Sequence, residues 1–376
     1  VFAPLLNTLR SGANHAQMIE QIDYWNITYS NYQNGIGEWK QKVAQQQNYA
    51  FESMILDSVD LVGATCIGIQ SKKKFKNIDF DVTIIDEAGQ IQVHDALVPI
   101  SLSPKVIMLG DHKQIPPMAD QDLVAACNDN NTDPSFLSKS LFEDMYNRAP
   151  DGCKIMLDTQ YRMPGDIADT ISEWFYDGKY LSLPFKYQIK TKDLMLPSLS
   201  DRAYLLIDTS GVPGRHEHAI PGGGCDNRLE AAIIKSLISI RLNERSQISA
   251  EDLTPVDDEI GVISAYKAQV KIIRQELTGM LPDNTIRTMA ASLDSFQGQE
   301  RDLIIYSFTK SSDKPANMRR IGFLNELRRL NVAMSRCKKT LVMIGDMQFL
   351  GGCKHTDKDE DGNEIYNQSE KQFGDF

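Results

Sequence analysis

Short apolar runs alternate with helix-length segments along most of this chain. In its first half the runs cover residues 61–68, 82–85 and 106–109, and small or acidic residues follow or end each run. Runs of this length are typical of buried strands. Strands that alternate with helices predict βαβ units and a parallel sheet. We therefore predict an α/β fold that begins near residue 58.

A second set of strand-length runs follows a turn-rich stretch near residues 148–155. Between these runs, Leu229, Ile233 and Leu237 keep the i, i+4 spacing of a helix with one buried face. The pattern predicts two α/β domains, over residues 58–150 and 151–350. The runs of the second set are residues 155–157, 204–207, 260–264, 303–308 and 341–344.

The two ends of the chain have a different character. Residues 1–57 are polar and rich in Asn and Gln, and we expect a peripheral helical hairpin or stalk there, open to protein partners or upstream domains. Residues 351–376 are acidic without periodicity, and we expect a flexible end or a connection to a further segment.

Composition places the chain among ordinary folded proteins. Of its 376 residues 41% are hydrophobic and 24% charged, which excludes a disordered chain, a collagen-like chain and a small disulfide scaffold. No apolar run approaches the roughly 18 residues that cross a bilayer, so we expect no membrane partner. The net charge of -11 argues weakly against non-specific wrapping of nucleic acid but allows a local basic groove.

The cysteines indicate a reducing environment. All 6 are scattered, without a C-x-x-C pair or a zinc-ligand spacing. No signal segment opens the chain. We expect free thiols and an intracellular protein, either cytoplasmic or nuclear.

An acidic pair, Asp86 and Glu87, comes directly after the run at residues 82–85. In α/β sheets, functional groups gather at the carboxyl ends of parallel strands. One acid can hold a magnesium ion while the other orients a water molecule. An acidic helix N-terminus gives the same pattern, so the pair alone leaves both interpretations open.

The next run leads into the stretch GDHKQ. Gly110 permits a tight turn, and Asp111 and Gln114 place polar groups at the tip of the predicted strand. Gln114 can hydrogen-bond a phosphate group or an attacking water. The alternative is a turn that is merely capped by these side chains.

Two arginines and one acidic loop in the second half complete the candidates. Arg162 and Arg336 offer planar guanidinium groups that suit phosphate oxygens, although a surface ion pair is the commoner role of any single arginine. Glu300 precedes the run at residues 303–308 and can accept hydrogen bonds from a ribose, or is an exposed acid. We expect the neighbouring Phe296 in the core.

Six stretches, taken in order, resemble motifs II to VI of the superfamily 1 helicases, over roughly residues 58–346. They are VTIIDEAGQ, VIMLGDHKQIPP, LDTQYRM, IGVISAYKAQ, SLDSFQGQERDLII and GFLNELRRLNVAMSRCKK. GDxxQ with a double proline, QYRM and SFQGQE resemble the branch that contains the nonsense-mediated-decay helicase and senataxin. The resemblance implies two RecA-like P-loop NTPase domains, with ATP in the cleft between them and a single strand of DNA or RNA across the top. It also implies movement from 5′ to 3′.

The resemblance further implies a role for each matched residue. Asp86 would hold Mg²⁺, Glu87 would activate the hydrolytic water, and Gln114 would sense the γ-phosphate. Arg162 and Arg336 would act as arginine fingers. The other implied contacts are Tyr161 on the adenine, Gln299 and Glu300 at the ribose side, and Thr65, Tyr266 and Ser292 along the nucleic-acid path.

One motif of the family is absent from the chain. No G-x-x-x-x-G-K-[ST], whose backbone amides and lysine hold phosphate groups, occurs among the 376 residues. The stretch DGKY at residues 177–180 lacks the upstream glycine and the hydroxyl. Because the chain begins at Val1, we expect this motif upstream of it. The first domain would then be incomplete, and the chain alone would not hydrolyse ATP efficiently.

Three functional hypotheses follow. The leading one is an ATP-dependent nucleic-acid helicase or translocase. The second is a non-hydrolysing helicase remnant that binds nucleic acid or a protein, which the retained acids, Gln114 and the two arginines disfavour. The third, an unrelated phosphotransferase that uses the acidic pair, does not explain the arginines or the QGQE stretch.

Overall fold

The chain consists of two compact units in a computed structural model, one of residues 1–83 with 94–107 and one of residues 84–93 with 108–376. The structure describes residues 15–45, 55, 58–71, 80–182, 193–221, 223–249, 253–296, 298–314, 321–325, 327–352, 357–358 and 364–365. None of the helices in these ranges has the length and apolar character needed to span a membrane.

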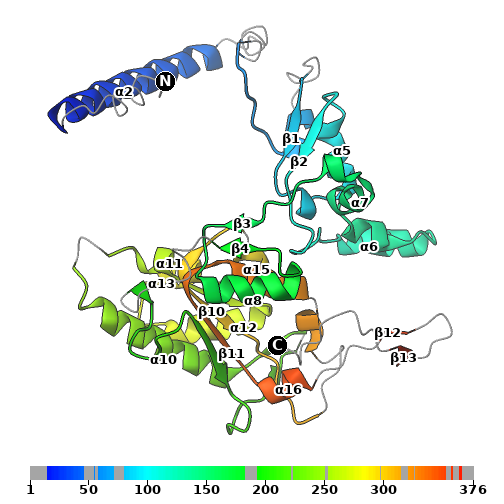
Figure 1. The fold of residues 1–376 in the computed structure, drawn as a ribbon, viewed down its shortest axis with the longest axis vertical. Coiled ribbons are helices and arrows are strands. Elements are labelled where there is room, and N and C mark those ends of the chain that lie inside the picture. Colours follow the sequence, from blue (N-terminus) through cyan, green and yellow to red (C-terminus); the bar gives the residue numbers. More distant parts are fainter. Residues whose placement is uncertain are drawn as a thin grey trace. The chain divides into compact units, whose positions relative to one another are not determined.

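The described part of residues 1–57, where a helical hairpin or stalk is predicted, contains one long helix, α2 (His15–Gln45) (Figure 1). Ile27 and Tyr32 are more than half exposed on it, which agrees with its loose periodicity. The predicted strand at residues 61–68 is wrong, because a short helix, α4 (Cys66–Ser71), begins there. The Thr65 hydroxyl accepts a hydrogen bond from the Gly68 N–H at 3.0 Å, a contact that favours a helix start.

Two of the predicted strands form the small sheet that leads to the acidic pair. They are β1 (Thr83–Ile85) and β2 (Val106–Met108), with α5 (Val93–Ile100) between them in the chain. The turns after the two strands nearly touch. A Cβ atom on Gly110 would lie 2.7 Å from the Gly89 nitrogen, so the absent side chain lets the DEAG and GDHKQ turns approach each other.

A five-stranded parallel sheet forms the centre of the larger unit and confirms the predicted α/β fold class (Figure 1). Its strand order is β5-β11-β10-β8-β9, and every neighbouring pair is parallel. The strands are β5 (Tyr204–Asp208), β8 (Ile260–Ser264), β9 (Ala290–Ser292), β10 (Arg301–Ser307) and β11 (Cys337–Gly345). Each takes up or overlaps an apolar run, except β9, whose three residues were too short to predict.

The predicted strand at residues 155–157 is wrong. Ile155 and Leu157 are 86% and 81% exposed and belong to no strand. The nearest strand is β3 (Thr159–Gln160), which pairs with β4 (Leu181–Ser182) in a small sheet of its own. Three apolar residues in a row therefore gave a false signal, since no neighbouring strand covers them.

Alternating side chains of the central strand β10 divide the core into two clusters, as the pleat of a strand requires. Ile304 and Tyr306 pack with α8 (Gly165–Phe175) and α15 (Leu327–Ser335). Leu303 and Ile305 pack with α10 (Arg228–Arg245), α12 (Lys267–Leu277) and α13 (Asp283–Met289). Each fully buried side chain of this size stabilises the fold by about 1.5–3 kcal/mol.

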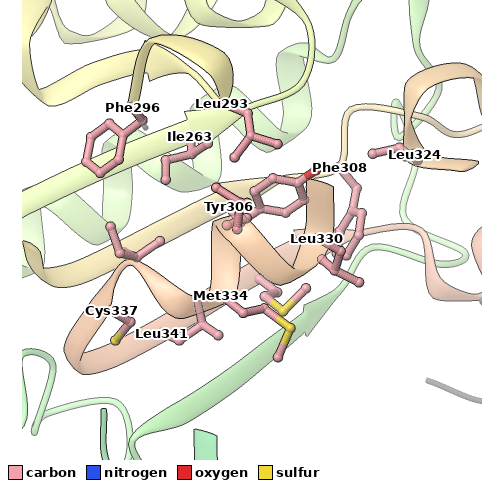
Figure 2. Packing of buried hydrophobic residues seen from close by; sticks show 14 of the residues in the cluster. Ile263, Leu293, Phe296, Tyr306, Phe308, Leu324, Leu330, Met334, Cys337 and Leu341 are labelled. Carbon is pink, nitrogen blue, oxygen red and sulfur yellow. The ribbon is translucent and has the colours of Figure 1, made fainter. Parts of the chain in front are cut away.

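Figure 2 shows the first of these clusters, in which Tyr306 and Phe308 lie beside Leu330 and Met334 of α15. The rings of Tyr306 and Phe308 meet edge to face, with centroids 5.0 Å apart. Phe296 belongs to the same cluster and is fully buried, which confirms its predicted place in the core. The shorter elements of this unit are α6 (Gln121–Asp129), α7 (Leu141–Arg148), β6 (His218–Ala219), β7 (Cys225–Asp226), α11 (Val256–Glu259), α16 (Met347–Gly351), β12 (Asp357–Lys358) and β13 (Glu364–Ile365).

A buried carboxyl group lies at the carboxyl end of this sheet. Glu230 is fully buried and accepts hydrogen bonds from the Ser307 hydroxyl (2.6 Å), the Thr309 N–H (2.9 Å) and the Asn227 amide (3.2 Å). Burial raises the pKa of Glu230 from 4.5 to about 8, against the opposing effect of the bonds from Ser307 and Thr309. Burial therefore favours the protonated form of Glu230 in the folded chain.

The approach of the two glycine turns predicts the effect of one methyl group. Gly110→Ala should lower the free energy of unfolding by about 1–3 kcal/mol, because the added Cβ would force the two turns apart. The measurement is urea-induced unfolding, with Gly152→Ala as the matched control, since a Cβ there meets nothing within 4 Å. An equal effect of the two substitutions would contradict the close approach.

The state of Glu230 predicts a dependence of stability on pH. Its raised pKa stabilises the fold fully below pH 4.5, and this contribution is lost as the pH rises towards 8. Glu230→Gln cannot ionise, so wild type should lose stability relative to it across this window, by up to several kcal/mol at about 1.4 kcal/mol per pKa unit. Unfolding at several pH values tests this, with the partly exposed Glu276→Gln as control. A constant difference would show that Glu230 is already charged when folded.

Candidate functional site

The two acids of the predicted site lie in the turn after β1, and both are exposed. Glu87 has a left-handed backbone (φ 52°), which is uncommon for a residue with a side chain. Asp86 Oδ1 accepts a hydrogen bond from the Glu87 N–H at 2.9 Å, and Glu87 Oε2 accepts one from the Gln90 amide at 2.8 Å. These bonds hold two adjacent carboxylates at the strand tip, where the sequence places them.

The GDHKQ turn presents Gln114 in a fixed orientation. Asp111 Oδ1 accepts from the Lys113 N–H at 2.9 Å, and its Oδ2 accepts from Gln114 Nε2 at 2.8 Å. Because Nε2 is held in this way, Oε1 is the free end of the Gln114 amide. It accepts a hydrogen bond from Arg336 Nη2 at 3.1 Å.

Arg336 is the most unusual group of this cluster. It is only 5% exposed, and its Nε has no hydrogen-bond partner among the described residues. Burial, and next the charge of Arg162, lower the pKa of Arg336, while Glu87 and Glu300 act in the opposite direction. A buried N–H without an acceptor costs about 1–3 kcal/mol, so a ligand oxygen at this place would be favourable.

Arg162 lies beside Arg336 and is held by two contacts. Its Nε donates to Glu300 Oε2 at 2.7 Å and its Nη1 donates to the Ser335 carbonyl at 2.9 Å. The second contact attaches Arg162 to the residue that precedes Arg336. The structure therefore brings together the two predicted arginines, Gln114 and Glu300, although up to 222 residues of sequence separate them.

Contacts of α15 with its neighbours support the position of Arg336. Arg328 forms a two-fold ion pair with Glu143 of α7, with N–O distances of 3.2 and 2.7 Å. Arg329 pairs with Asp294 at 2.7 Å. Paired guanidinium and carboxylate groups in this geometry fix the planes of both side chains. These two arginines therefore serve the packing of α15.

The acids fit a magnesium ion that arrives with a substrate. No group of three or more His, Cys, Asp or Glu side chains that could hold a metal exists within the described ranges. Mg²⁺ often binds through only one or two carboxylates, with waters and substrate phosphates as the other ligands. Asp86, exposed at the strand tip, suits that kind of coordination.

The residues predicted to contact the base and the ribose differ in exposure and in hydrogen bonding. The Tyr161 ring is 65% exposed and open to stacking. Both ends of the Gln299 amide are used within its own loop, since Oε1 accepts from Arg301 at 2.9 Å and Nε2 donates to the Ser295 carbonyl at 3.2 Å. Gln297, which belongs to the same predicted stretch, lies outside the described residues.

The three residues predicted along the nucleic-acid path differ in exposure, and one of them lies in the other unit. Thr65 belongs to the other unit, where it is exposed and caps α4. Tyr266 is only 6% exposed, and its hydroxyl donates to the Ile321 carbonyl at 2.9 Å. Ser292 is 8% exposed and bonds the Ser295 hydroxyl at 2.8 Å.

Ser292 and Ser295 also line a groove that the sequence did not reveal. The groove has a volume of about 710 Å³ and lies between α12 and α13. Its four cations come from two helices and an interval of some twenty residues, so no local run of charge marks them. They are Lys267, Lys271, Arg274 and Arg287, with Asp283 as the acidic residue of the lining. We name this feature the α12–α13 groove.

The cations of the α12–α13 groove are in part available to a ligand. Arg274 donates to the carbonyls of Arg287 and Ala290. No ion pair is recorded for Lys267, Lys271 or Arg287 with another described residue. On a chain with a net charge of -11, such a cluster favours an anion.

Comparison with known proteins agrees with this geometry. Two family profiles, each described as AAA domain, match residues 14–121 and 137–348. The DNA-binding protein SMUBP-2 of Mesocricetus auratus is 30% identical over 329 residues, which cover 84% of this chain and 30% of that protein. The chain spans less than a third of the length of the relatives named here.

Two fungal proteins are also similar to this chain. The regulator of nonsense transcripts 1 homolog of Neurospora crassa is 31% identical over 312 residues, which cover 81% of this chain and 26% of that protein. The ATP-dependent helicase NAM7 of Saccharomyces cerevisiae is 30% identical over 310 residues, which cover 80% of this chain and 28% of that protein. These matches confirm the resemblance carried by the motifs. The chain belongs to the AAA-domain family, as a superfamily 1 helicase of the branch that includes the nonsense-mediated-decay helicase and senataxin.

Proposed function

We propose that this chain is part of an ATP-dependent helicase or translocase that acts on single-stranded nucleic acid. The observation that carries the proposal is the buried Arg336, whose Nε has no acceptor among the described residues and whose Nη2 donates to Gln114 Oε1. A terminal phosphate of ATP would supply the missing acceptor. The relative NAM7 is named an ATP-dependent helicase, which supports the nucleotide.

Asp86, Glu87 and Gln114 have separate roles at the reacting phosphate. Asp86 holds Mg²⁺, which when bound neutralises charge on the phosphate oxygens. Glu87 accepts a proton from the attacking water, and its bond to Gln90 keeps the carboxylate in place. Gln114 senses the γ-phosphate through Arg336, whose Nη2 donates to the Gln114 Oε1, and the same oxygen can accept a hydrogen bond from the attacking water.

Arg336 and Arg162 act on the charge that develops during phosphoryl transfer. A guanidinium in a site shielded from water stabilises this charge more strongly than one at the surface. Arg336 is shielded and forms the inner finger, and Arg162 is steadied by Glu300 and the Ser335 carbonyl. Tyr161 offers its exposed ring to the adenine. Gln299 and Glu300 are assigned to the ribose side from the family resemblance alone.

A phosphate loop is needed to complete this site. The sequence contains no G-x-x-x-x-G-K-[ST], so the cradle of the α- and β-phosphates is proposed to come from a segment outside these 376 residues. The absence of this motif from the 376 residues also favours a second candidate function, that of a non-hydrolysing protein that binds nucleic acid. Dependence of strand release on ATP separates the two, because a pure binder holds its strand regardless of nucleotide.

The α12–α13 groove is the proposed place of the nucleic-acid backbone on the larger unit. The groove contains Lys267, Lys271 and Arg287, which form no ion pair with another described residue. It also contains Ser292, which matches a family position along the nucleic-acid path. The backbone carries one negative charge per nucleotide, and proteins that bind it without base readout combine basic grooves with stacking side chains. Tyr266, in the loop that leads into α12, and separately Thr65 of the other unit are proposed from the family resemblance as further residues that contact nucleic acid. The direction of movement, 5′ to 3′, is proposed from the family resemblance.

The catalytic assignment predicts large kinetic effects in a chain joined to an upstream segment that carries G-x-x-x-x-G-K-[ST], called here the loop-completed chain. Arg336→Ala should reduce kcat for ATP by about 10³-fold or more, as the loss of an arginine finger does. Glu87→Gln should retain ATP binding but lose turnover. Arg148→Ala serves as a control, because its side chain is 79% exposed. A reduction of less than tenfold by Arg336→Ala would exclude the finger role.

The groove predicts a change in the salt dependence of strand binding. Replacing Lys267, Lys271 and Arg287 together by Ala should weaken binding of a fluorescein-labelled dT oligonucleotide and flatten the slope of log K against log salt by about 2, since each lost contact accounts for roughly 0.7. The charge-matched control replaces Arg148, Lys154 and Lys235, which lie outside the groove. Equal slopes for the two triple variants would place the strand elsewhere.

A further inference from the structure

The hydroxyl of Tyr176, the residue that follows α8, both donates and accepts a hydrogen bond. The hydroxyl donates to Asp111 Oδ2 at 2.5 Å and accepts from Asn331 Nδ2 at 2.9 Å. Burial, followed by the charge of Asp111 and the hydrogen bond to it, raises the pKa of Tyr176. The proton therefore stays on the tyrosine, and Tyr176 remains a donor to Asp111.

Asn331 of α15 connects to the same turn from its other side. It is fully buried, and its Nδ2 also donates to the Lys113 carbonyl at 2.9 Å. Five positions later in the chain, Arg336 bonds Gln114. One segment of the chain thus contacts the GDHKQ turn at two points, at its backbone and at its last side chain.

These contacts form a continuous series of hydrogen bonds, called here the circuit, and the chain itself joins its two ends, since Asn331 and Arg336 belong to one segment. It runs from Asn331 to the Tyr176 hydroxyl, to Asp111, to the Gln114 amide and to Arg336. The circuit fixes which end of the Gln114 amide faces Arg336. If Asp111 turned away, Gln114 Nε2 would lose its acceptor, and only the bond from Arg336 to Oε1 would hold the amide.

We propose that Tyr176 is a positioning residue for ATP hydrolysis, which sets the orientation of Gln114 through Asp111 and links it to α15 through Asn331. The kinetic part of this inference rests on the proposed function. Tyr176 lies outside the six stretches that carry the helicase resemblance, the nearest of which ends at Met163. It acts through Asp111 and Gln114 and contacts no substrate.

Tyr180 offers a matched control for the tyrosine hydroxyl. Its ring stacks on that of Tyr176, with centroids 5.2 Å apart and an angle of 16° between the planes. Its backbone N–H bonds the Ser172 hydroxyl at 2.8 Å, whereas no hydrogen bond of its own hydroxyl is recorded to a described residue. Tyr180→Phe therefore removes the same atom from the same stack without opening the circuit.

The first test uses the 376-residue chain without nucleotide. Exchange of the Gln114 side-chain amide protons with solvent is followed by NMR, and the signals are identified by their loss in Gln114→Ala. Tyr176→Phe should accelerate this exchange several-fold, and Tyr180→Phe should leave it within twofold of wild type. Unchanged exchange in Tyr176→Phe, or equal acceleration in both variants, overturns the circuit, whatever the outcome for ATP hydrolysis.

The second test uses the loop-completed chain. Tyr176→Phe should lower kcat about tenfold and leave KM within twofold, because the ordering of Gln114 matters in the transition state. In a Gln114→Ala background the same substitution should have almost no further effect. An equal tenfold loss in both backgrounds would show that Tyr176 acts only on the fold. If wild type hydrolyses no ATP, the proposed function fails and the exchange experiment alone decides on the circuit.

Discussion

The burial of one permanent charge, the guanidinium of Arg336, is the constraint on which the rest of the site depends. Removing a charge from water is unfavourable unless acceptors and opposite charges surround it. Gln114 supplies one acceptor, and Glu87, Glu300 and Asp111 supply negative charge. One N–H of the group is still left without an acceptor among the described residues. A group of side chains that surrounds a buried cation and leaves one of its N–H groups without an acceptor is what a phosphate-binding site requires.

The hydrophobic core makes this burial possible. Tyr306 of the central strand packs with Leu330 and Met334 of α15, so the helix cannot tilt without breaking the cluster. The ion pair of Arg328 with Glu143 connects α15 to the helix on its other side. Arg336 follows directly after α15, and its place is therefore decided by packing that has no catalytic role. Because this packing fixes the end of α15, it also explains why Arg336 meets Arg162 and Gln114, which lie far from it in the sequence.

The sequence predicted the fold class because buried parallel strands leave a strong apolar pattern, as β8, β10 and β11 show. It failed at residues 61–68, where Thr65 starts a helix, and at 155–157, where no strand pairs with the run. The acids, Gln114 and the arginines were predictable from motifs. Tyr176 was not, and Asn331 was given no role although it lies in the last of the six stretches. The roles of both come from side-chain contacts between segments, which no local pattern reports. The same holds for the α12–α13 groove, whose cations come together only when two helices pack.

These residues are proposed to form one side of an ATP site that a phosphate loop completes. The most direct test measures ATP turnover by this chain and by the loop-completed chain, each with and without single-stranded DNA or RNA. We expect no turnover by the chain alone and strand-stimulated turnover once the loop is present. Strand-stimulated turnover by the chain alone would contradict the account, because the phosphates would then be held by residues that it does not assign. No turnover in either protein would favour a binding role instead.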